Sequence, residues 1–158
     1  MPFMESFNLA QLTKEMVVAQ IRSLGDPARL ASETVRGTLI ARLKGHRLSN
    51  YEIQEAVSEV CRGAIQGMII TESPMGRGAA RALMAAEAAG REAGLDAALV
   101  ANAAVKGISD ARRFVSREVL VLMSRHLEGV RRGAGQSFTS FCTDLNAHQS
   151  HPDYIAPV

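Results

Sequence analysis

The sequence predicts an all-α protein, a compact helical bundle of about five helices with close-packed Gly and Ala helix faces. Apolar residues recur at spacings of three and four along most of the 158 residues, which is the period of an amphipathic helix. The Ser, Asp, Pro and Gly residues that begin and end helices fall between these stretches. No segment shows a convincing strand pattern, so the three observations agree on the fold class.

The length and composition predict one domain with a core of small side chains. A chain of this length fits a single domain, and we expect a helical domain over residues 1–146 and an extended or mobile tail over 147–158. The chain has no Trp, two Tyr and five Phe, so Ala, Val, Leu, Ile and Met must build the core. Because small side chains bury less area each, cohesion must come from many contacts or from association between chains.

The first two predicted helices are separated by a short breaking sequence. Residues 8–24 carry apolar side chains at helical spacing. In the Gly-Asp-Pro sequence of residues 25–27, Gly suits the end of one helix, while Asp caps the next and Pro fits its first turn. The second helix should run to about Lys44 and end at Gly45.

The third predicted helix begins with a capping box. Ser49 and Glu52 have the spacing at which each side chain accepts a hydrogen bond from the other residue's backbone N–H. The helix has an apolar stripe formed by Ile53, Val57, Val60, Ala64 and Met68.

Three further helices are expected in the second half of the chain. Ser73, expected to be a helix cap, is followed by Pro74, and together they predict the start of an Ala-rich helix over residues 76–91. After a Gly-Leu-Asp sequence at 94–96 that breaks or bends the chain, we expect one long helix over 97–132. A short last helix over 137–146 follows the glycines at 133 and 135.

Small residues four apart predict close contacts between helices. Gly63 with Gly67, and Ala103 with Gly107, each share one helical face. An interior Gly costs about 1 kcal/mol of helix stability relative to Ala, a cost that is tolerable where two backbones approach each other. These four residues are therefore the candidate packing or interface residues, toward a helix of this chain or of another copy.

The nearest approach to a ligand motif lies in residues 73–81. Gly76 and Gly78 lie at the start of a helix, as in dinucleotide sites, but Arg81 stands where a third glycine would be needed. Such a site also needs a strand over residues 68–71, where the helical stripe continues. Arg77 and Arg81 are therefore weak candidates for binding an anion, and we predict no cofactor.

The sequence predicts neither a metal site nor a catalytic residue. None of the four His residues has a Glu three positions before it, as a di-iron helical bundle requires. The sequence around His148 and His151 could ligate a metal, but it lies in the predicted tail. Cys61 and Cys142 lack nearby groups that would activate a thiol, and we expect Cys61 to be a buried apolar residue. A non-catalytic role is favoured, although the sequence does not decide whether the protein is an enzyme.

Charge and hydropathy limit the partners. The net charge of +2 and the scarcity of aromatics disfavour nucleic acid. The basic late region is expected to be a solvated face or, alternatively, a surface for an anionic protein, lipid or nucleic acid; its arginines are Arg112, Arg113, Arg117, Arg125, Arg131 and Arg132. Neither a signal peptide nor a membrane span is evident, which predicts a cytoplasmic protein that is not an integral membrane protein.

The leading functional hypothesis is a non-catalytic helical bundle that acts by self-association or as a small, partner-binding subunit of a larger assembly. The Ala-rich, Trp-free composition resembles that of the phasins, which coat polymer granules through amphipathic helices. This resemblance implies, as an alternative, an amphipathic coat protein of a granule or membrane surface. A second alternative is a phosphate or nucleotide binder, or an enzyme, that uses residues 73–81.

Overall fold

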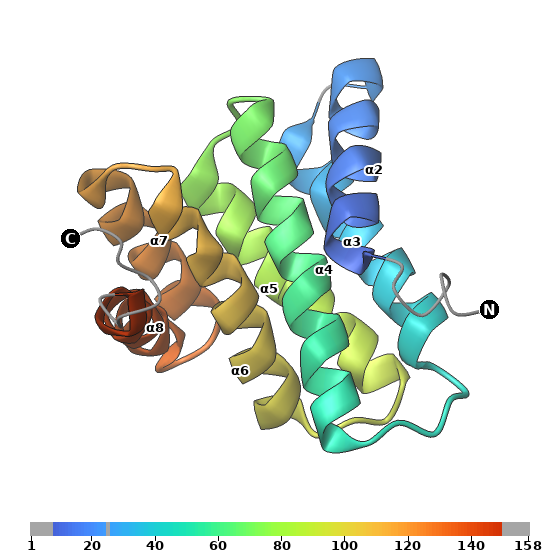
Figure 1. The fold of residues 1–158 in the computed structure, drawn as a ribbon. Coiled ribbons are helices and arrows are strands. Elements are labelled where there is room, and N and C mark those ends of the chain that lie inside the picture. Colours follow the sequence, from blue (N-terminus) through green and yellow to red (C-terminus); the bar gives the residue numbers. More distant parts are fainter. Residues whose placement is uncertain (1–7, 25, 150–158) are drawn as a thin grey trace.

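The computed structural model describes residues 8–24 and 26–149, with the side chains of 23, 24 and 144–149 excepted. Over these residues the chain is helical and contains no strand, which confirms the all-α class (Figure 1). The expected number of about five helices is too low, because this part of the chain forms seven α-helices and one 3₁₀ helix. They are α2 (Leu9–Leu24), α3 (Pro27–Leu43), α4 (Asn50–Ile70), α5 (Met75–Glu92), α6 (Ala97–Ile108), η1 (Ser109–Arg113), α7 (Arg117–Val130) and α8 (Ala134–Gln149).

Local capping signals place the starts of α3 and α4 where the sequence predicts them. The Asp26 carboxylate accepts a hydrogen bond from the backbone N–H of Arg29. Ser49 and Glu52 form the full capping box, with distances of 2.8 Å from the Ser49 backbone N to Glu52 Oε1 and 3.1 Å from the Glu52 backbone N to Ser49 Oγ. Both interactions join residues three apart, so they depend on little beyond the local sequence.

The predicted cap at Ser73 is wrong. The N-cap residue of α5 is Pro74, and no side chain caps this end of the helix. Glu72 adopts a left-handed conformation with φ of 55°, and the Ser73 backbone N–H then donates to the Met68 carbonyl at 2.8 Å. Ser73 Oγ lies 2.8 Å from Thr71 Oγ1, so Ser73 closes α4 instead of opening α5.

The predicted long helix over 97–132 is also wrong, because η1 and a turn separate α6 from α7. Ser109 Oγ donates to the Lys106 carbonyl at 2.6 Å as α6 ends. The buried Asp110 carboxylate then accepts a hydrogen bond from Gln66 Nε2 of α4 at 2.9 Å, which fixes the turn against that helix. Ser116 caps α7 by accepting from the Val119 backbone N–H.

At residues 94–96 the chain breaks and does not merely bend. Gly94 adopts φ of +74°, a conformation that a residue with a side chain rarely takes, and the Leu95 N–H donates to the Gly90 carbonyl at 2.9 Å. Asp96 then caps α6 through the Leu99 N–H at 3.0 Å. At the other end of the chain, α8 extends through 149, and residues 150–158 of the predicted tail lie outside the described part.

The helices form two layers, because each helix from α2 to α7 packs most extensively on the α-helix two positions away in the chain. The leading pairs are α2 with α4, α3 with α5, α4 with α6, and α5 with α7. Figure 1 shows α2, α4 and α6, here called the first layer, in front of α3 and α5, which form the second layer with α7. The last helix, α8, packs on α6, α7 and η1 at one end of the molecule.

Glycines lie where the helices of the first layer approach most closely. A Cβ atom at Gly63 of α4 would collide with the backbone carbonyl of Ala10 in α2. A Cβ atom at Gly107 of α6 would collide with the Ser58 carbonyl of α4. At Gly67 the added atom would lie 3.0 Å from both the Lys14 carbonyl O and the Val17 side chain. The fourth candidate packing residue, Ala103, is buried in α6. These contacts are all within one chain, and contact of these faces with another copy stays a prediction.

Candidate functional site

The outer side of α7 leaves two large apolar side chains exposed to solvent. Only Met123 and Leu127 of this helix are buried, whereas Val121 and Leu122 are 46% and 45% exposed. The helix at the opposite end of the second layer, α3, has no large apolar side chain that is exposed. The two ends of that layer therefore differ: α3 presents a polar outer face, and α7 does not.

A groove of about 560 Å³ runs between α7 and α8, and we call it the α7–α8 groove. Its deepest residues are Phe138, which is 1% exposed, and the buried Cys142. Among the residues whose side chains are described, the charged ones that line it are Arg117 and Arg125, both exposed. The groove residues are Arg117, Leu120, Val121, Ser124, Arg125, Phe138, Thr139, Cys142 and Thr143.

The hydroxyl groups of the α7–α8 groove already have partners within the chain. Ser124 Oγ donates to the Gly135 carbonyl at 3.0 Å, and Thr139 Oγ1 donates to the same carbonyl at 3.1 Å. Thr143 Oγ1 donates to the Thr139 carbonyl at 3.0 Å. An occupant would therefore meet an apolar surface and two guanidinium groups, with no hydroxyl donor left unused.

A carboxylate of α7 caps the start of α8. Glu128 accepts hydrogen bonds from the backbone N–H groups of Gly133 at 2.8 Å and Gly135 at 2.9 Å. These bonds stabilise the charged form, so they hold the pKa of Glu128 below its usual value. A helix N-terminus normally attracts anions, and here the protein's own carboxylate fills that position. This role of Glu128 was not predicted, although an acidic residue shortly before a Gly-Ala-Gly sequence was a usable signal.

Replacing Glu128 with Gln should lower the melting temperature of the protein. It should also make the stability of the folded state depend less on pH in the acidic range. Because the folded-state pKa of Glu128 is lowered, its contribution to stability is present above the unfolded-state pKa and is lost as the pH falls through the folded-state value. Unfolding curves of both proteins between pH 7 and pH 3 check this. Parallel stability–pH curves would contradict the capping role, and Glu118→Gln, on the same helix, is the control.

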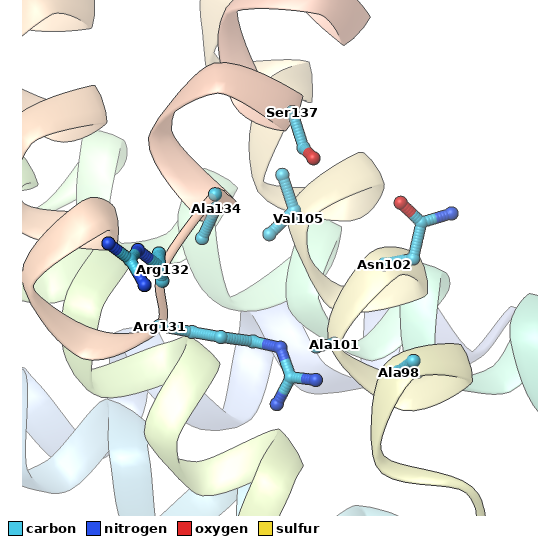
Figure 2. Close-up of a pocket in the computed structure, with 9 residues that line it drawn as sticks. Ala98, Ala101, Asn102, Val105, Arg131, Arg132, Ala134 and Ser137 are labelled. Atoms are coloured by element: carbon cyan, nitrogen blue, oxygen red, sulfur yellow. The ribbon is translucent and has the colours of Figure 1, made fainter.

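A second cavity, of about 200 Å³, lies between α6 and the start of α8 (Figure 2). Figure 2 shows the Arg131 side chain extending toward the alanines of α6, while the Arg132 side chain points away from α6. Arg131 Nη1 lies 3.3 Å from Glu87 Oε2, so its charge is already paired. With the amides of α8 taken by Glu128, this cavity is a poorer anion site than its two arginines suggest.

The candidate anion residues of segment 73–81 lie apart from both cavities. Met68 to Ile70 form the last turn of α4, so the strand that a dinucleotide site requires is missing here. Gly76 packs toward the ring of His126, with 2.6 Å between an added Cβ and His126 Cδ2. Arg77 is exposed and Arg81 is partly exposed on α5. Their binding of an anion stays a prediction.

The other candidate groups are dispersed. Within the described residues, no group of three or more His, Cys, Asp or Glu side chains is placed to hold a metal ion. His46 and His126 are exposed, and His148 and His151 lie where side chains are not described. In the basic late region, Arg113 pairs with Asp110 and Arg131 with Glu87, whereas Arg117 and Arg125 face the α7–α8 groove.

Both thiols should react slowly in the folded protein. Burial raises the pKa of Cys61 to about 12, and it raises that of Cys142 to about 11 against the opposing effect of the Arg112 charge. Because the thiolate is the reactive form, we expect neither residue to be labelled by a disulfide reagent at pH 8 until denaturant is added. Rapid labelling of one thiol in native protein would show that its helix opens locally.

Comparisons with models of protein families, with curated proteins and with solved structures find no match to this chain. Among the described helices, none combines the length and the apolar composition that a bilayer span requires.

Proposed function

We propose that this protein is a non-catalytic helical bundle that acts by association, either with further copies of itself or as a small subunit of a larger assembly. The association surface is the end of the molecule formed by α7 and the α7–α8 groove. In this proposal the protein works in the cytoplasm, where its two free cysteines stay reduced.

The observation that carries the proposal is the contrast between the two ends of the second layer. Stacked helical hairpins need a polar outer face on their terminal helices, since an apolar one invites further packing. The outer face of α3 meets this requirement, whereas α7 exposes Val121 in the apolar groove and Leu122 next to it in sequence. Scattered apolar residues are common on surfaces, but contiguous ones mark interaction sites.

Sedimentation of the full chain over a range of dilutions tests the self-associating form of the proposal. In that form the mass should exceed the 17.0 kDa of one chain, and Val121→Lys should reduce it. Met84→Lys is the matched control, because Met84 is similarly exposed but lies on α5, away from the groove. A monomer at every concentration that also binds no amphipathic helix would overturn the proposal.

A further inference from the structure

We infer that the partner of the α7–α8 groove is an acidic amphipathic helix that lies along α7 and places one carboxylate on Arg117 and another on Arg125. This inference rests on the proposed association surface and names the chemistry of its partner. The arrangement of the helices, the charges of the groove and the exclusion of a self-pairing each support it.

The layer arrangement indicates that the occupant is a helix. In the second layer α5 has a neighbour on each side, namely α3 and α7, whereas α7 has a layer neighbour only on the side of α5. The groove side of α7 carries the exposed Val121, whereas α3 has no exposed large apolar side chain. A helix packed along α7 would continue the layer and cover Val121 together with the half-buried Leu120.

The charges of the groove indicate that the partner is acidic. Neither Arg117 nor Arg125 forms an ion pair within the described part of the chain, and Glu118 is not among the groove residues. Eight residues along a helix span about 12 Å, so carboxylates two turns apart on the partner match the two guanidinium groups. Arginine suits this role because its planar group can bind a carboxylate through two hydrogen bonds.

The same charges disfavour a second copy of α7 as the occupant. A two-fold axis near Val121 would pair α7 with its copy in antiparallel orientation, and each Arg117 would then face Arg125 of the other copy. Like charges opposed in an interface weaken association. A partner helix with carboxylates at those positions reverses the sign of both interactions.

Three labelled synthetic helical peptides of one design test the inference on the full chain. They share a Leu stripe and differ only at two positions seven residues apart, which carry Glu, Gln or Lys. By fluorescence anisotropy at low salt, we expect the Glu peptide to bind about tenfold more tightly than the Gln peptide, and the Lys peptide to bind most weakly. The preference should shrink at high salt because exposed charges are screened.

A charge-reversed protein provides the sharper comparison. Arg117→Glu/Arg125→Glu should bind the Lys peptide better than the Glu peptide, while Arg47→Glu/Arg91→Glu should keep the original order. The control changes the net charge equally at two exposed arginines outside the groove. If the reversed protein unfolds, Arg117→Gln/Arg125→Gln should remove the preference for Glu over Gln without reversing it.

Each alternative occupant has its own outcome. Equal binding of the Glu and Gln peptides would overturn the inference that the partner is acidic, but it would not contradict the proposed association surface. Binding of no peptide by a protein that stays monomeric would overturn both proposals. Dimers that Val121→Lys no longer forms would identify a second copy instead. A tenfold gain in peptide affinity on removing residues 150–158 would identify that segment as the occupant and overturn the external helix.

Discussion

Replacing Gly63 with Leu should lower the free energy of unfolding by about 3 kcal/mol, the upper end of the usual cost of overpacking. The new side chain would enter the contact between α4 and the Ala10 carbonyl of α2. A backbone carbonyl cannot rotate away as a flexible side chain can, so the two helices must separate. Gly107→Leu should act similarly, because its neighbour is the Ser58 carbonyl of α4.

Gly37 supplies the matched control for this substitution. It lies within α3 and a Cβ atom there would meet nothing within 4 Å. Gly37→Leu should therefore raise stability by about 0.5–1 kcal/mol, since Gly is a poor helix former. Urea-induced unfolding measures both changes in the free energy of unfolding, provided that this free energy falls with urea concentration at the same rate in each variant. Equal effects at Gly63 and Gly37 would show that helix propensity, and not the contact, determines the result.

The second large effect is expected at Phe138. Phe138→Ala should cost about 3–5 kcal/mol, the range for removing a buried aromatic ring. Phe138 belongs to the core and lies at the base of the α7–α8 groove, so its loss should also loosen α8 from α7. The variant should accordingly bind the acidic peptide less well, which anisotropy would detect.

Phe114→Ala is the control for this prediction, because Phe114 is 55% exposed. Its replacement should change stability by no more than about 0.5 kcal/mol. If Phe138→Ala unfolds at the same urea concentration as Phe114→Ala, then Phe138 does not hold α8 in place. The groove would in that case lack the rigid base that selective docking needs.

Helix ends were predictable where the signal is local. The Gly-Asp-Pro sequence at 25–27 and the capping box of Ser49 and Glu52 act through residues three apart, and both caps begin the predicted helices. The break within 97–132 could not be predicted in this way. Val105, Ile108, Val115 and Val119 keep helical spacing through it, while Asp110 is held by Gln66, 44 residues earlier in the chain.

Residue type and spacing alone therefore determined the all-α class, most helix boundaries and the small-residue character of the core, because each depends on backbone preferences within a few residues. Only the tertiary structure decided which glycines meet another backbone: Gly63 and Gly107 do, whereas Gly37 and Gly129, also within helices, face open space. It also decided that Glu128 caps α8 and that α7 is left uncovered. The physical reason is that packing partners and solvent exposure come from segments distant in sequence, and neither is encoded in the local period of a helix.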